Sequence, residues 1–90
     1  MDQTFLLQLN RWNEEEEYQK IIEAVEALPE EKKTPVLISE MACAYNNLAE
    51  ADDSRLFEKA AELLESVEEE LSADHRWNFR MGYACYYLNR

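Results

Sequence analysis

The side chains that could carry chemistry are few, and none has the neighbours that a catalytic or metal site needs. His75 is the single histidine, and no second His or Cys lies near it at metal-ligand spacing. Cys43 and Cys85 lie far apart with no base beside them in the sequence, so we expect buried free thiols in a reducing cytoplasm. Gly82 is the only glycine, which excludes the glycine-rich loops that hold nucleotide phosphates. We therefore expect no enzyme activity, no cofactor and no bound metal.

Two acidic runs, residues 14–17 and 68–70, have the charge of a cation site without its pattern. Calcium loops need alternating oxygen ligands and a turn glycine, and di-metal helical sites need Glu-x-x-His pairs. The first run is predicted at the start of a helix, where the helix dipole favours negative charge, and the second near a helix end, where it does not. Both are expected to be solvated surface, with the second run the better candidate for contact with a basic partner.

The overall charge restricts the possible partners. The net charge is −11, from twenty acidic and nine basic residues, so neither nucleic acid nor an anionic membrane is an expected partner. No apolar run approaches the ~20 residues of a membrane span. The amino terminus, residues 1–4, also lacks the basic region of a secretory signal. A cytoplasmic protein whose partner is a protein or peptide is expected.

The elements that must position these residues are predicted to be helices. Hydrophobic residues make up 47% of the chain, enough for one core, while one Gly and two Pro are too few for an all-β protein. Asn13 with Glu16 forms a capping-box pattern, Thr34 precedes Pro35 as a cap, and Ser72 or Asp74 could cap the last helix. The sequence thus predicts a single all-α domain over residues 1–90. Its five helices are expected at about residues 4–11, 14–28, 35–48, 54–70 and 74–88.

A helical hairpin recurs along the chain. Residues 41–48 align with residues 81–88, 40 positions later, and residues 21–28 align with residues 60–67, 39 positions later. A hairpin that repeats at such a spacing is typical of an α-solenoid.

The repeated hairpin resembles the tetratricopeptide (TPR) family. The similarity is carried by a large-then-small pair early in the first helix, an aromatic three residues on, and a small-x-x-x-large pair in the second helix. These are Met41-Ala42 and Met81-Gly82, then Tyr45, then Ala60 with Leu64. The spacing exceeds the usual ~34 residues, and Trp77 lies one position from the family's tryptophan, which leaves open a Sel1-like or other divergent array. The resemblance implies antiparallel hairpins stacked as a short right-handed α-solenoid of about two and a half repeats.

A concave groove that binds peptides is what the resemblance implies for function. The groove-facing residues would come from the first helix of each hairpin: Val36, Ser39, Cys43, Asn46, Asn47, Arg76, Phe79, Arg80, Tyr83, Tyr86 and Tyr87. Two arginines one turn apart, beside Tyr hydroxyls and Asn amides, could hold a carboxylate or phosphate. Alternatively, Arg76 and Arg80 pair with acidic neighbours such as Glu40. The expected function is a non-catalytic protein-interaction module.

The last helix, residues 74–88, is apolar nearly all round. Trp77, Met81, Ala84, Cys85 and Leu88 form one stripe, while Phe79 and three tyrosines cover much of the remainder. A helix of this kind is expected to be buried on more than one side. Three explanations stay open: the chain is the amino-terminal piece of a longer array, it forms a homodimer through this helix, or the aromatics bind a partner. A structural or homo-oligomerisation domain that supports further helices or a domain beyond residue 90 is therefore the alternative function.

Overall fold

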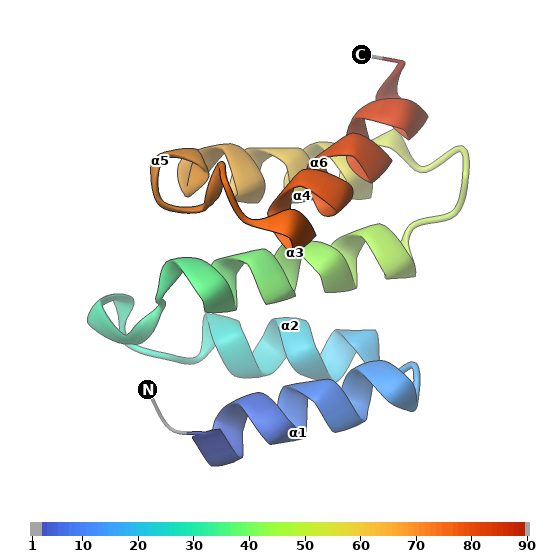
Figure 1. The fold of residues 1–90 in the computed structure, drawn as a ribbon. Coiled ribbons are helices and arrows are strands. Elements are labelled where there is room, and N and C mark those ends of the chain that lie inside the picture. Colours follow the sequence, from blue (N-terminus) through green and yellow to red (C-terminus); the bar gives the residue numbers. More distant parts are fainter. Residues whose placement is uncertain (1–2, 90) are drawn as a thin grey trace.

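A computed structural model describes residues 3–89 of the chain. Within this range all regular structure is helical, with six α-helices and one short 3₁₀-helix (Figure 1). The elements are α1 (Gln3–Glu14), α2 (Tyr18–Glu26), η1 (Glu30–Lys32), α3 (Pro35–Leu48), α4 (Ser54–Ser66), α5 (Glu68–Leu71) and α6 (His75–Leu88).

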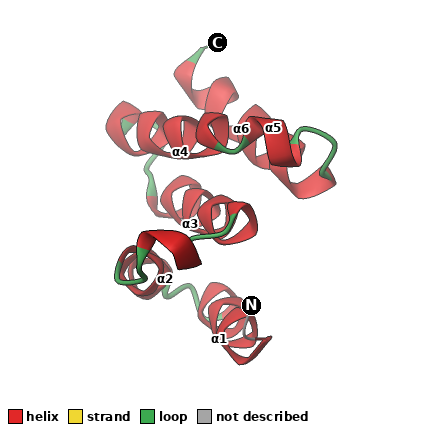
Figure 2. Cartoon of the chain, turned by 90° about the vertical axis from the view of Figure 1, so that its left-hand side faces the viewer, coloured by secondary structure: helices red, strands yellow, loops and turns green. Residues whose placement is uncertain are grey.

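Each long helix packs antiparallel on its neighbour in the sequence, because the connections between them are short. Viewed from the side, α3 lies between α2 below and α4 and α6 above (Figure 2). The last helix, α6, packs mainly on α4 and also contacts α3. The all-α prediction is confirmed, whereas the prediction of five helices is wrong for the described residues.

The apolar stripes of these helices meet in two hydrophobic clusters. The first joins α1, α2 and α3 and contains Leu9, Val25 and Met41, each at most 4% exposed. The second joins α3, α4 and α6 around small side chains, which let the helices approach closely. Its fully buried members are Ala42, Ala60, Ala61, Leu64 and Ala84. Ile38, Tyr45 and Leu63 contact both clusters and connect them.

The turn between α1 and α2 differs from the predicted capping box at Asn13. Helix α1 continues through Asn13 to Glu14, and the Asn13 carbonyl accepts a hydrogen bond from the Glu16 amide at 3.2 Å. The Glu17 amide donates to the Trp12 carbonyl at 2.7 Å, and Glu16 lies at φ 61°. This pattern is a Schellman motif with Glu16 in the left-handed position. The helix-end signal was missed because that position usually carries glycine.

Replacing Glu16 with glycine should therefore stabilise the protein by about 1 kcal/mol. A residue with a Cβ is strained at this backbone conformation, and glycine is not. Urea unfolding followed by circular dichroism measures the change. Glu15→Gly is the matched control and should be neutral or destabilising, and equal effects at the two positions would contradict the assignment.

The predicted caps of the later helices are confirmed. The Thr34 hydroxyl accepts a hydrogen bond from the Leu37 amide at 3.3 Å, and the Asp74 carboxylate accepts one from the Trp77 amide at 2.8 Å. Between Ser72 and Asp74, the cap of α6 is thus Asp74. The predicted helix at residues 54–70 instead breaks at Val67, whose backbone is non-helical (φ −120°, ψ 18°) while its side chain is buried.

The positions of the two acidic runs differ in part from those predicted for them. Residues 14–17 run from the last residue of α1 through the turn to Glu17, the N-cap of α2, whereas residues 68–70 form the first turn of α5. The helix dipole of α2 favours Glu17, as predicted for the first run, whereas Glu14 lies at the disfavoured end of α1. The second run lies at a helix start, the reverse of its prediction. The break at Val67 is the cause for the second run, because it starts a new helix where one long helix was expected.

Candidate functional site

Helix α6 has one face in the core and the opposite face open. Trp77 and Ala84 are buried, and the Trp77 indole nitrogen donates a hydrogen bond to the Leu64 carbonyl at 2.8 Å. The other members of the predicted inward stripe, Met81, Cys85 and Leu88, are half-buried. On the opposite face, Phe79 is 71% exposed and Tyr86 is 75% exposed.

Five rings form a continuous aromatic cluster along this side of α6: Phe57 of α4 and Phe79, Tyr83, Tyr86 and Tyr87 of α6. Tyr87 stacks on the buried Phe57 ring, with centroids 4.8 Å apart and planes 5° apart. Tyr83 contacts Tyr87 at 5.2 Å and Phe79 at 6.3 Å. The cluster is therefore anchored in the core at Phe57 and becomes progressively exposed towards Phe79 and Tyr86.

The exposed rings surround an open hollow of about 470 Å³. Its lining is mostly apolar and includes Gly82 between the rings of Phe79, Tyr83 and Tyr86. A Cβ built on Gly82 would meet nothing within 4 Å. No described neighbour requires a glycine here, and Gly82 leaves the helix backbone bare in the lining of the hollow. We call the set Phe79, Gly82, Tyr83 and Tyr86 the aromatic face.

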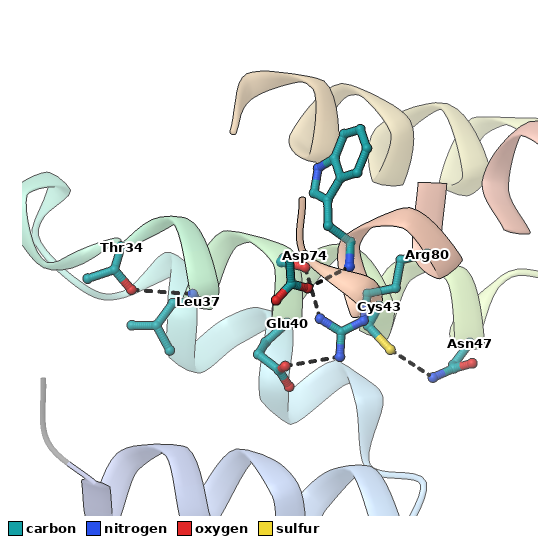
Figure 3. Close-up of polar contacts among 9 residues, drawn as sticks. Thr34, Leu37, Glu40, Cys43, Asn47, Asp74 and Arg80 are labelled. Carbon is teal, nitrogen blue, oxygen red and sulfur yellow. Dashed lines mark hydrogen bonds and ion pairs between the residues drawn. The ribbon is translucent and has the colours of Figure 1, made fainter. Parts of the chain in front are cut away.

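Arg80 forms a largely buried salt bridge with Glu40. Its guanidinium donates to a Glu40 carboxylate oxygen at 3.0 Å and to the Ser39 hydroxyl at 2.9 Å (Figure 3). The two charged side chains are only 13% and 12% exposed. Of the two sequence interpretations, pairing with Glu40 holds for Arg80, so this guanidinium already has partners within the fold.

Cys43 and Asn47 lie beside this ion pair on α3. The Asn47 amide donates to the Cys43 sulfur at 3.5 Å (Figure 3). Burial raises the pKa of the Cys43 thiol above its usual value and outweighs the opposing effect of the Arg80 guanidinium. Cys43 and Cys85 are free thiols and only half-buried, where full burial was predicted.

Alkylation of Cys43 should be several-fold slower in the folded protein than in the unfolded chain. A raised pKa leaves less thiolate at pH 8, and the thiolate is the reacting form. Because the folded state holds this proton more tightly, stability should also fall as pH rises through the usual thiol pKa. Iodoacetamide labelling of Cys85→Ser, with and without urea, measures the rates. Equal rates under the two conditions would contradict the expectation.

Asn46 serves helix packing rather than a groove. It is 3% exposed, and its amide nitrogen donates to the Arg80 backbone carbonyl at 3.1 Å. Its amide oxygen is buried with no hydrogen-bond partner among the described residues. Asn47, in contrast, is exposed.

Arg76 is the exposed member of the arginine pair. It lines a small cleft of about 160 Å³ between α3 and α6, with Asp74, Glu40 and Arg80 among the other lining residues. Within residues 3–89 it forms no salt bridge. The two arginines therefore differ in role: the Arg80 guanidinium is paired inside the fold, whereas the Arg76 guanidinium is exposed to solvent.

The predicted site residues therefore divide into two groups. Arg80 and Asn46 hold α6 on α3. Asn47, Arg76 and the aromatic residues Phe79, Tyr83 and Tyr86 are exposed, and Tyr87 is half-buried on the Phe57 ring. The sequence did not indicate Phe57 as the anchor of the cluster or Gly82 as part of the lining of the hollow. Phe57 lies 30 residues before Tyr87, so no local spacing indicates their contact.

Within the described part of the chain, no group of three or more His, Cys, Asp or Glu side chains is placed to hold a metal ion. None of the helices there is long and apolar enough to cross a membrane. Comparisons of the chain with protein-family models, with curated proteins and with solved structures found no match.

Proposed function

We propose that this chain is a non-catalytic protein-interaction module in which TPR-like hairpins stack as a short right-handed α-solenoid. Two features support this architecture. Helix α3 packs on α2 and α4, and α6 packs on α4 and also on α3, as expected for successive hairpins of a stack. The 40-residue sequence repeat relates α3 to α6, which fits both as first helices of successive hairpins. The free thiols fit a cytoplasmic location.

The observation that carries the function is the exposure of the aromatic face. Soluble proteins rarely leave several large rings together in solvent, and aromatic side chains contribute heavily to binding where they become buried. Here two rings more than 70% exposed flank an apolar hollow on a chain with a net charge of −11. A protein or peptide partner that covers this face would bury apolar area while removing few charged groups from water.

The polar contacts of the proposed site come from exposed residues only. Arg76 and Asn47 are exposed and can contact a peptide carboxylate or backbone, with the Asn47 amide oxygen still open beside its amide's hydrogen bond to Cys43. The Arg80 guanidinium instead binds Glu40 and Ser39 within the fold. A single exposed arginine forms a weaker anion contact than a pair. We therefore assign most of the binding energy to Phe79 and Tyr86.

Selection of peptides from a random display library on the immobilised protein tests this function. Affinities of the selected peptides would be measured by fluorescence anisotropy for the wild type, Phe79→Ser and Tyr86→Ser. Each substitution should weaken binding at least about tenfold, the effect of losing one well-packed aromatic contact. Leu7→Ser removes an equally exposed side chain on α1 (67%) and should leave binding unchanged. Enrichment of no peptide, or equal affinities in all four proteins, would refute the proposal.

A further inference from the structure

Helices α3 and α6 are equivalent in the repeat, yet one of their equivalent faces is covered and the other is not. On α3, three residues that face away from α2 are at most 3% exposed: Ser39, Ala42 and Asn46. Their counterparts 40 positions later are Phe79, Gly82 and Tyr86, all exposed. Ala42 lies in the second hydrophobic cluster, against α4 alanines. The aromatic face therefore occupies the position of a helix-packing face and has a small residue within it. No helix among residues 3–89 covers it.

The distribution of charge indicates what can cover it. Every other helix in the described chain contains at least one Asp or Glu, whereas α6 contains none. Two copies of a protein with a net charge of −11 repel each other, and the repulsion is weakest where carboxylates are fewest. Among the described helices that position is α6, where the apolar hollow also lies.

From this we infer that a second copy of the chain covers the aromatic face, in an antiparallel α6–α6 pair about a twofold axis. The inference rests on the proposed function, because it names the partner of the same surface. The face is symmetric along the helix: Phe79 lies as far before the midpoint between Gly82 and Tyr83 as Tyr86 lies after it. An antiparallel pair centred there places Phe79 of one copy against Tyr86 of its partner, at both ends of the contact.

Gly82 has a defined use in this pair. Glycine inside a helix costs about 1 kcal/mol relative to alanine, and no contact within the chain requires it. At the centre of the pair, its bare backbone lets the two helices approach closely enough for the rings on either side to reach across. The exposed Arg76 then lies near the carboxyl end of the partner's α6, where the helix dipole favours positive charge.

Sedimentation equilibrium over a range of protein concentrations tests the inference on the full chain. The wild type should show a monomer–dimer equilibrium that tightens at least about tenfold between about 0.1 M and about 1 M NaCl, because salt shortens the screening length from about 10 Å to about 3 Å. Phe79→Ser and Tyr86→Ser should each weaken it at least about tenfold, the effect of losing one well-packed aromatic contact. Leu7→Ser should not weaken it. Circular dichroism confirms that each variant is folded.

A cross-link tests the geometry directly. With Cys43 and Cys85 replaced by serine, Gly82→Cys should form a disulfide-linked dimer under mild oxidation, because the two copies meet at this position. Leu7→Cys in the same background is the control and should remain largely monomeric. A dimer that cross-links equally at both positions would overturn the inference.

The remaining outcomes separate this inference from the proposed function. A chain that is monomeric at all concentrations, yet binds selected peptides through Phe79 and Tyr86, overturns the second copy and leaves the interaction module standing. A dimer that is insensitive to Phe79→Ser and Tyr86→Ser uses another surface and also overturns it. A dimer with the expected sensitivities, from which no peptide is selected, supports the pair and refutes a peptide groove.

Discussion

Replacing Arg80 with methionine should lower the free energy of unfolding by about 3–5 kcal/mol, the cost of removing one partner from a buried ion pair. The Glu40 carboxylate is only 12% exposed and would lose its cationic partner. The Ser39 hydroxyl would lose its charged donor as well. Urea unfolding followed by circular dichroism measures the loss.

The double variant Arg80→Met with Glu40→Leu should recover much of that loss. Apolar residues of similar volume commonly replace a buried ion pair at little cost. Arg76→Met is the control, since Arg76 is exposed and should change stability by less than about 0.5 kcal/mol. If Arg80→Met were as mild as Arg76→Met, the pair between α3 and α6 would not contribute to stability.

Substitution of Trp77 is the second change with a large expected effect. Trp77→Ala should cost about 3–5 kcal/mol, because it empties a buried site between α4 and α6. Trp77→Phe keeps most of the ring volume and loses the hydrogen bond to the Leu64 carbonyl, so about 1–2 kcal/mol is expected.

The opposite face of the same helix provides the comparison. Phe79→Ala removes a ring that is 71% exposed and should change the stability of the monomer by less than about 0.5 kcal/mol. Thermal unfolding at low protein concentration compares the three variants. A Phe79 variant as unstable as Trp77→Ala would place the aromatic face in the core.

The ends of the helices could be predicted from the sequence where a local rule applies. They could not be predicted where contacts between residues far apart in the sequence determine them. The caps at Thr34 and Asp74 depend on side chains next to the helix start, and both are confirmed. The left-handed turn at Glu16 and the break at Val67 carry no glycine or proline, so composition gives no warning of them. At Val67 the non-helical backbone accompanies a side chain buried in the second cluster, and a local pattern does not contain that contact.

The candidate site was predictable in outline but not residue by residue. Helical spacing predicted that α6 would have a core stripe and a second aromatic side. It did not show that Tyr87 lies on Phe57, or that Asn46 lies under the Arg80 carbonyl, because both partners are far away in the sequence. Helical periodicity locates a side chain on its own helix, whereas its exposure depends on which neighbour covers it.

The division of the core into two clusters has a consequence for cooperativity. Helix α1 packs mainly on α2 and contributes only to the first cluster, whereas α3 contributes to both clusters. Local opening of α1 therefore costs less free energy than opening of α3 or α4. Amide hydrogens of α1 should exchange with solvent first, and those of α3 and α4 only on global unfolding. Native-state hydrogen exchange would then show a chain that unfolds from its amino-terminal end inward.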